Sequence, residues 1–289
     1  MDHKLKTILF RMLALLPNKV DDFFYHKIQG FFERSTLDDR LKSVEYTCLR
    51  LSKVLHKLNI DVKDKTVFEF GSGWFPSMPY FFKYKYEAKE VLTCDINKHF
   101  KKDTVLELNQ IFSKKYNCTI IPESGNRFGL PSGIEYFPNY NIIAEDIPSA
   151  DIVFSRYVLS HMRENDVISL HKKMKMELKK GTTVIHFISP SDLRQHGDNT
   201  ISLQEFLKYS TLEWDKIHTK FDYHNRLRLP QFLEIFTTCG LEVAHLEYES
   251  TKSGTKLYDL FKKVKLHTDY MRYSDEQLTA GNILVVLKV

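Results

Sequence analysis

Cysteine is scarce in this chain of 289 residues, and the few that occur do not form a pattern. The four positions are Cys48, Cys94, Cys118 and Cys239, which are far apart and include no Cys-x-x-Cys pair. A zinc site needs closely spaced ligands, and a disulfide framework is typical of small secreted domains. The spacing therefore argues against both and favours a reducing cytoplasm.

Long hydrophobic runs and blocks of like charge are also missing. The apolar segment 7–17 contains Arg11 and ends in a proline, so it is too short for a bilayer span, and no small-residue cleavage site follows it. We expect no integral membrane span. The segment is predicted to pack as an amphipathic helix, with peripheral membrane contact as the alternative. The net charge of +5 is spread among 37 acidic residues, so no nucleic-acid partner is expected.

The most informative stretch is a strand followed by a glycine turn. Residues 66–70 form a β-branched and aromatic run that predicts a buried strand, and Gly71-Ser72-Gly73 follows it. A second apolar run, 91–94, ends in Asp95. A strand, glycine turn, helix and second strand ending in a carboxylate are typical of a nucleoside-binding unit, in which the carboxylate accepts hydrogen bonds from the ribose hydroxyls.

This motif differs from the dinucleotide fingerprint, which has a third glycine where Pro76 stands. Trp74, Phe75 and Pro76 leave little room for a pyrophosphate at a helix N-terminus. Glu69, two residues before Gly71, suits a cationic ligand. The alternative is an ordinary glycine turn in an α/β fold.

Acid-x-Gly-x-Gly resembles the first motif of class I S-adenosylmethionine-dependent methyltransferases. The resemblance implies S-adenosylmethionine (SAM) as cofactor, with the glycine loop at its methionine end and Asp95 on its ribose. The predicted cofactor-binding residues include the motif, the loops after the second and third strands, and the exit of the fourth. They are Glu69, Gly71, Ser72, Gly73, Trp74, Asp95, Ile96, Tyr140, Asn141, Ser155 and Arg156.

Periodicity along the rest of the chain predicts an α/β fold. Helical spacing predicts an N-terminal helical cap over residues 1–60, which covers the sheet or closes over the cofactor. Further strands are expected at 134–138, 152–155, 182–188, 241–248 and 282–289, with helices between them. Together they make a doubly wound, mostly parallel, Rossmann-like seven-stranded sheet in a methyltransferase domain over 61–289. An insert at 189–228 follows the fifth strand, and a helix-containing connection is expected within 251–279.

Residues 186–228 are rich in His, Asp and Arg, and they follow the end of a parallel strand, where open α/β sheets bind ligands. A hydroxyl acceptor needs a base with a pKa near neutrality, and arginine binds anionic groups bidentately. The predicted catalytic residues are His186, His196 and Asp192. The predicted substrate-binding residues are Asp198, Tyr223, Asn225, Arg226 and Arg228.

Structural roles are the alternatives for several of these residues. His186 could be a satisfied core histidine, and the two arginines could form ion pairs. His196 could bind a metal with Asp192 and Asp198, which we rank below a metal-free site. Trp214 and Tyr223 are interpreted as core residues rather than sugar platforms, and His161 as a helix-start or core residue.

A second resemblance covers residues 15–250. The elements His186-x-Ile188, Asp192-x₃-His196-x-Asp198 and Tyr223-x-Asn225-Arg226-Leu227-Arg228, with Trp74 and Pro76, resemble bacterial class I methyltransferases associated with sugar and surface-polysaccharide biosynthesis. Ser189 and Leu193 depart from the acidic and histidine residues that this group often has. The resemblance implies O-methylation of a sugar or glycan-linked group on a small-molecule or glycan acceptor.

Two other functions are compatible with the sequence. The first is methylation of another small molecule at nitrogen, oxygen or phosphate. The second is an inactive, methyltransferase-like binding subunit, against which the intact Glu69, Gly71, Gly73 and Asp95 argue.

Overall fold

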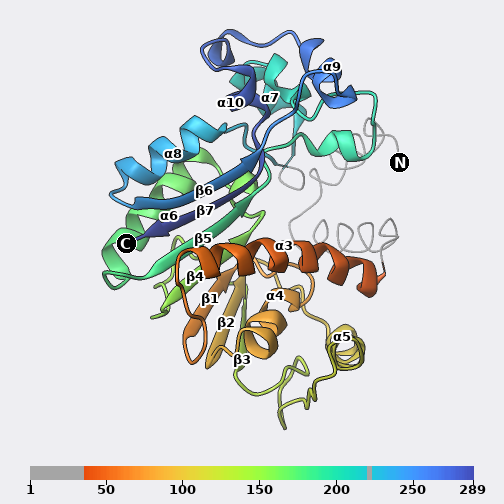
Figure 1. Cartoon of the computed structure of the whole chain (residues 1–289), viewed down its shortest axis with the longest axis vertical. Helices are drawn as coiled ribbons and strands as arrows, with labels where there is room; N and C mark the ends of the chain where they lie inside the picture. Colours follow the sequence, from red (N-terminus) through yellow and green to blue (C-terminus); the bar gives the residue numbers. More distant parts are fainter. Residues whose placement is uncertain (1–35, 220–222) are drawn as a thin grey trace.

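A seven-stranded sheet runs through the molecule in the computed structural model, which describes residues 36–219 and 223–289 (Figure 1). The strands are β1 (Thr66–Phe70), β2 (Glu90–Asp95), β3 (Ile134–Pro138), β4 (Ile152–Arg156), β5 (Thr183–Ile188), β6 (Glu242–Glu249) and β7 (Gly281–Lys288). Their order is β3-β2-β1-β4-β5-β7-β6, in which only β7 runs antiparallel to its neighbours. This is the sheet of a class I methyltransferase, so the predicted fold class is confirmed.

Helices connect the strands on both faces of the sheet. They are α3 (Leu37–Lys57), α4 (Ser77–Tyr80), the π-helix η1 (Phe81–Lys85), α5 (Lys102–Tyr116), η2 (Leu159–His161), α6 (Glu164–Glu177), η3 (Leu193–His196), η4 (Glu205–Lys208), α7 (Thr211–Ile217), α8 (Leu229–Thr238), α9 (Lys256–Lys262), η5 (Thr268–Tyr270) and α10 (Asp275–Thr279). The predicted helices before residue 36, and the segment 7–17 considered for membrane contact, lie outside the described residues. Within the described part, no helix has the length and hydropathy of a membrane crossing.

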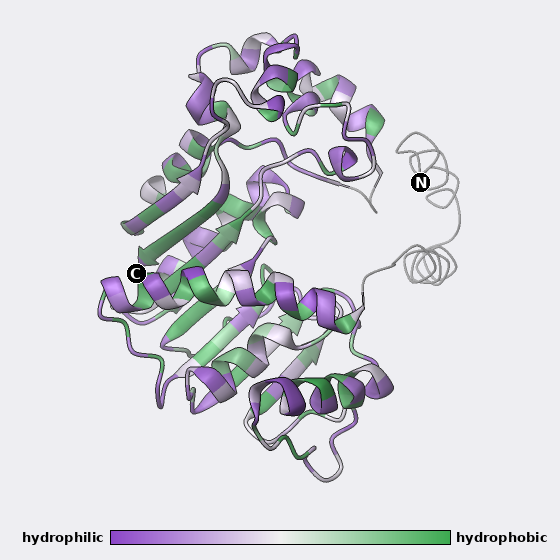
Figure 2. Cartoon of the chain, turned by 45° about the vertical axis from the view of Figure 1, so that its right-hand side comes forward, coloured by the Kyte–Doolittle hydropathy of each residue, from purple (hydrophilic) through white to green (hydrophobic). Residues whose placement is uncertain are grey.

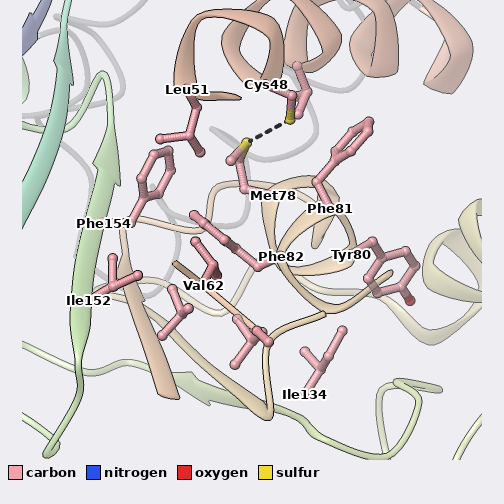
Figure 3. Close-up of a cluster of buried hydrophobic side chains, with 14 of the residues drawn as sticks. Cys48, Leu51, Val62, Met78, Tyr80, Phe81, Phe82, Ile134, Ile152 and Phe154 are labelled. Carbon is pink, nitrogen blue, oxygen red and sulfur yellow. Dashed lines mark hydrogen bonds between the residues drawn. The ribbon is translucent and has the colours of Figure 1, made fainter. Parts of the chain in front are cut away.

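Alternating strand residues divide the core into two layers. Val67, Phe154 and Phe187 belong to the layer beneath α3, α4 and α5, whereas Phe68, Val153 and Val184 belong to the layer beneath α6 and α8. The first layer includes the packed aromatic side chains of Figure 3. In Figure 2 the inner strands are mostly green (hydrophobic), as expected where both faces of a sheet are covered, whereas the edge strand β6 is mixed. A residue's parity on its strand therefore decides which layer it faces.

Helix α3 begins at a capping box in which Thr36 and Asp39 bond reciprocally. Leu41, Val44 and Leu51 recur at helical spacing and are buried against the sheet. The helix is therefore fixed both at its start and along one face, as the sequence predicts.

The two segments inserted after β5 and between β6 and β7 form one lobe (Figure 1). Phe206 and Trp214 from the first segment pack with Phe261, Tyr270 and Leu278 from the second in a separate hydrophobic cluster. β5 ends, β6 ends and β7 begins at the same edge of the sheet, because Ile188 pairs with Ile283 and Glu249 with Gly281. The lobe therefore stands at the carboxyl edge of the parallel strands.

Candidate cofactor and acceptor site

The glycine loop is held against the end of β2. The backbone N–H groups of Gly71 and Ser72 donate to the carbonyl of Cys94, at 2.8 and 3.0 Å. Gly71 has a φ of +75°, and a Cβ there would lie 2.2 Å from a methyl carbon of Val158. Gly73 has a φ of +66°, and a Cβ there would meet nothing within 4 Å. Gly71 therefore allows close packing on the β4 exit, while the bare backbone of Gly73 faces open space.

A cavity of about 280 Å³ lies between this loop and α3. Its lining comes from the β1 exit, α3, α4 and the end of β4. The lining residues are Arg40, Ser43, Val44, Glu69, Gly71, Ser72, Gly73, Trp74, Phe75, Ser77, Met78 and Arg156. Helix α3, the described helix of the predicted N-terminal cap, thus lines the cavity as well as covering the sheet.

Glu69 and Arg156 are two of the three charged residues that line the cavity, and Arg40 is the third. Glu69 is buried, and burial raises the pKa of its carboxyl to about 7, although a hydrogen bond from Thr93 and the nearby Arg156 act in the opposite direction. Arg156 donates to Thr47 Oγ1 at 2.9 Å and to Ser43 Oγ at 2.7 Å. The arginine thus ties β4 to α3, and the acid is available to a cationic group.

Asp95 lies at the end of β2, beside the loop. One carboxylate oxygen accepts the N–H of Gly73 at 3.0 Å, and the other accepts the N–H of Asn97 at 3.0 Å. A carboxylate offers about four lone-pair sites, so both oxygens can accept further bonds. Trp74 lies against the His99 ring, with 4.6 Å between ring centroids.

The loops after β2 and β3 meet beside Asp95. The N–H of Tyr140 donates to the carbonyl of Asp95 at 2.9 Å, which places residues 139–141 at this edge. Asn141 is exposed, and Ile96 is 63% exposed directly after the carboxylate. The structure therefore brings Tyr140, Asn141 and Ile96 close to Asp95.

Two predicted site residues face the wrong side of the sheet. Ser155 and His186 are fully buried, and Ser155 Oγ lies 2.8 Å from His186 Nδ1. His186 Nε2 lies 3.2 Å from His171 Nε2 on α6. Both residues have the parity of the α6/α8 layer, whereas Glu69 and Arg156 line the cavity on the α3 side. His186 as base and Ser155 as cofactor ligand are therefore wrong, and the structural alternative for His186 holds.

The other two predicted catalytic residues, Asp192 and His196, have different surroundings. Asp192 is buried and accepts hydrogen bonds from the Arg194 guanidinium, with Nε 2.9 Å from Oδ1. His196 is exposed at the end of η3. Asp198 accepts from the N–H of Thr200 at 3.0 Å. Within the described ranges, no three metal-binding side chains cluster.

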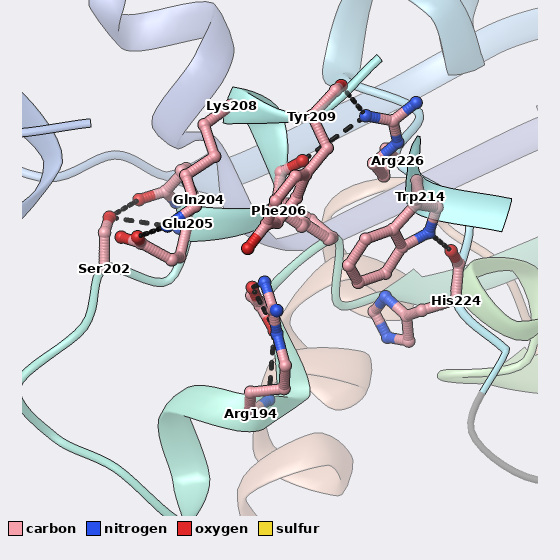
Figure 4. A network of polar contacts seen from close by, with 11 residues as sticks. Arg194, Ser202, Gln204, Glu205, Phe206, Lys208, Tyr209, Trp214, His224 and Arg226 are labelled. Carbon is pink, nitrogen blue, oxygen red and sulfur yellow. Dashed lines mark hydrogen bonds and ion pairs between the residues drawn. The ribbon is translucent and has the colours of Figure 1, made fainter. Parts of the chain in front are cut away.

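The two predicted anion-binding arginines are instead buried within the lobe. Figure 4 shows Arg226 beside Phe206 and Tyr209. Arg226 donates to the carbonyls of Phe206 and Tyr209 and to Thr211 Oγ1. Arg228 is fully buried and donates to the carbonyl of Arg226 at 3.0 Å. Neither guanidinium is presented to an acceptor, so their prediction as substrate-binding residues is wrong.

Asn225 and Tyr223 lie where the insert meets the β4 exit. The Asn225 amide donates to the carbonyls of Leu159 and Met162, at 2.6 and 2.9 Å, so this buried residue holds η2 rather than a ligand. Tyr223 is half-buried beneath the Arg163 guanidinium, which lies 4.9 Å from its ring centroid. Trp214 is a core residue, as predicted.

Sequence reasoning did not identify the α3 residues of the cavity or the contact between Val158 and Gly71. Arg40 and Ser43 are polar positions on an amphipathic helix and resemble an ordinary solvated face. Tyr157, with a φ of +61°, is a bulky residue in the left-handed region at the β4 exit. Such strain is found at functional sites, but the sequence carries no signal for it.

No protein-family model and no curated protein matches the chain. Among solved structures, human N-acetylserotonin methyltransferase in complex with SAM is 12% identical, with a TM-score of 0.40 over 88% of this chain and 56% of that protein. An O-methyltransferase family 2 protein from Planctomyces limnophilus, in complex with apigenin, is 11% identical, with a TM-score of 0.43 and coverage of 80% and 52%.

A candidate hemolysin from Streptococcus thermophilus is 15% identical, with a TM-score of 0.44 over 83% of this chain and 64% of that protein. The chain thus spans less than two thirds of the length of each of these three proteins. Similarity this low does not distinguish one activity from another. The function is therefore argued from the site itself.

Proposed function

We propose that the protein is a SAM-dependent methyltransferase that methylates a hydroxyl of a sugar or glycan-linked acceptor. The observation that carries the proposal is the position of Glu69 and Asp95. They lie at the ends of adjacent strands, on either side of a glycine loop that opens on a cavity. β1 is also where the strand order reverses, and open α/β sheets bind their ligands at that point.

The residues present fit this cofactor. Asp95 would accept the ribose hydroxyls, and Glu69 would face the cationic methionine end. Ile96, Tyr140 and Asn141 would border the adenine. When bound, the cofactor supplies a methyl group on a sulfonium sulfur. The chain then has to align an acceptor with that group and remove the acceptor's proton.

The acceptor class rests on the sequence resemblance and on the position of the lobe. The lobe stands beside the β4 and β5 exits, where an acceptor would approach the cofactor. Tyr223 and Asp198 remain predicted substrate-binding residues, and the exposed His196 remains a predicted catalytic residue. A sugar hydroxyl is weakly acidic, so the transfer is expected to need a base from this side.

Calorimetry with SAM and S-adenosylhomocysteine tests the cofactor. Asp95→Ala should weaken binding by a few kcal/mol, because hydrogen bonds to a charged group contribute about 1.5–3 kcal/mol each. Asp103→Ala, at an exposed acid in the first turn of α5, is the control and should bind normally. Absence of binding heat in the unmodified protein would favour the inactive binding subunit. Unchanged affinity in Asp95→Ala would show that Asp95 does not bind the cofactor.

A further inference from the structure

His161 is held at the junction between the β4 exit and the insert. Its Nδ1 lies 3.3 Å from the backbone carbonyl of Tyr223. A carbonyl only accepts hydrogen bonds, so Nδ1 must carry the hydrogen, and the neutral ring then has its lone pair on Nε2. Nε2 makes no hydrogen bond to any residue of the described part of the chain, and the residue is exposed. The fold thus selects one tautomer and leaves its basic nitrogen accessible.

The position of His161 relates it to the cavity. η2 follows β4 directly, and Val158, just before η2, is the residue whose side chain packs on Gly71. The N–H of His161 donates to the carbonyl of Val158 at 2.8 Å. The side-chain amide of Asn225, in the insert, donates hydrogen bonds to the η2 turn. His161 is therefore fixed between the glycine loop and the lobe.

His224 packs against His161 from the interior. Its ring meets that of His161 edge to face, with 5.0 Å between centroids and 88° between planes. It is 3% exposed, and neither of its ring nitrogens has a hydrogen-bond partner. Burial, with His161 and Arg228 nearby, lowers the pKa of His224 to about 3. His224 is therefore neutral near pH 7. Desolvation also lowers the pKa of His161, so that ring is neutral there too and has one unprotonated nitrogen. Its carbonyl accepts the Trp214 indole N–H at 2.9 Å, which fixes its backbone (Figure 4).

We propose that His161 is the general base of methyl transfer and that His224 is its positioning residue. This inference rests on the proposed function. The oxygen of the acceptor hydroxyl forms the new bond to the methyl carbon while the carbon–sulfur bond breaks, and that electron pair stays on sulfur. The hydroxyl proton passes to His161 Nε2, and the resulting imidazolium keeps its Nδ1–H bond to Tyr223. The proton later leaves to solvent through the exposed edge of the ring.

Two-bond ¹⁵N–¹H correlation spectra of the ¹⁵N-labelled full chain test the tautomer without any acceptor. The His161 signals are assigned by their loss in His161→Gln. At pH 7.5 we expect a protonated Nδ1 and an unprotonated Nε2. A ring protonated at Nε2 instead, or at both nitrogens, would overturn the proposal.

Turnover tests the role directly, with tritiated SAM and a panel of methyl glycosides and nucleotide sugars. His161→Gln should lower kcat at least about 100-fold, as loss of a general base does, with S-adenosylhomocysteine affinity within about twofold of normal. His56→Gln, on the far end of α3, is the control and should retain full turnover. A normal kcat in His161→Gln would show that His161 is not the base. The same conclusion would follow if His196→Gln lost turnover and His161→Gln did not.

His224→Ala should lower kcat and mix the His161 tautomers without weakening cofactor binding. His224→Phe should restore kcat and the single tautomer, because it restores the ring contact. A merely structural role would leave the tautomer unmixed in His224→Ala. If no panel compound is methylated although the cofactor binds, the sugar acceptor is wrong, and the tautomer spectra then decide for or against His161 independently.

Discussion

At the scale of single residues, the core contains a chain of hydrogen bonds through two neutral histidines. His171 Nδ1 lies 2.6 Å from the carbonyl of Val167 and therefore carries a hydrogen, which leaves Nε2 as an acceptor. His186 Nε2 can then donate to it, and the hydroxyl of Ser155 can donate to His186 Nδ1. Every ring nitrogen therefore has a partner while both rings are neutral.

This arrangement predicts acid sensitivity. Burial lowers the pKa of His171 to about 4, and burial and His171 lower that of His186 well below its usual value. The unfolded chain therefore binds more protons below pH 6.5, and the free energy of unfolding should fall as pH decreases from 6.5 toward 4. The limit is about 1.4 kcal/mol per pH unit for each histidine.

Urea denaturation between pH 7.5 and pH 5 measures this dependence. His171→Leu should show a shallower slope, since it removes one titrating group. His56→Gln, at an exposed position, should keep the normal slope. An equal slope in His171→Leu and the unmodified protein would contradict the assignment.

At the scale of elements, α3 joins the cavity to the rest of the fold through Arg156. The guanidinium bonds to Ser43 and Thr47 on α3 while it lines the same cavity as Glu69. Farther along the helix, Arg50 pairs with Glu247 of β6, with 2.9 Å between Nε and Oε1. The first half of α3 thus contacts the cavity residue Arg156, and the second half is tied to the sheet strand β6.

Replacing both Ser43→Ala and Thr47→Val should loosen the first half of α3. Each lost hydrogen bond is worth about 0.5–1.5 kcal/mol, or more where the arginine is left unpaired. We expect cofactor affinity to fall severalfold, measured by calorimetry. Ser52→Ala is the matched control, because Ser52 lies on the same helix and its hydroxyl bonds to that of Tyr86. This variant should change stability but not cofactor affinity. Equal losses of affinity in the two variants would mean that α3 acts only through overall stability.

At the scale of the whole molecule, the lobe is a second packing unit with a hydrophobic cluster of its own. Arg226 satisfies two carbonyls of the insert, and its guanidinium lies 5.9 Å from the Trp214 ring centroid and 5.5 Å from that of Tyr270. It therefore crosses from one inserted segment to the other. The motif that suggested anion binding instead holds the two segments of the lobe together.

Arg226→Leu should destabilise the lobe selectively. Leaving buried carbonyls unpaired costs about 1–3 kcal/mol each. Hydrogen exchange should therefore accelerate in residues 205–217, while the sheet strands and cofactor affinity stay unchanged. Lys208→Ala, which removes an exposed ion pair with Glu205, is the control, because exposed pairs contribute little. Uniform acceleration across the sheet would show that lobe and sheet unfold as one unit.

The sequence by itself determined where the strands lie along the chain and where the glycine turn follows the first of them. β-branched runs, the glycine turn and the terminal carboxylates act locally, so Glu69, Gly71 and Asp95 could be placed from neighbours in the chain. Strand parity also explains why the prediction for His186 is wrong. Ile185 and Phe187 face the layer of the cavity, so the residue between them must face the other side of the sheet.

The long-range contacts of the polar side chains around the insert were decided by the tertiary structure alone. Arg226 finds carbonyls about twenty residues away, Arg156 reaches α3, and His161 meets the carbonyl of Tyr223 across a gap of 62 residues. A guanidinium or imidazole in a sequence has the same chemistry whether it will meet a ligand or a backbone carbonyl. Which partner it meets depends on long-range packing, because a buried donor must be satisfied by whatever group the fold brings within reach.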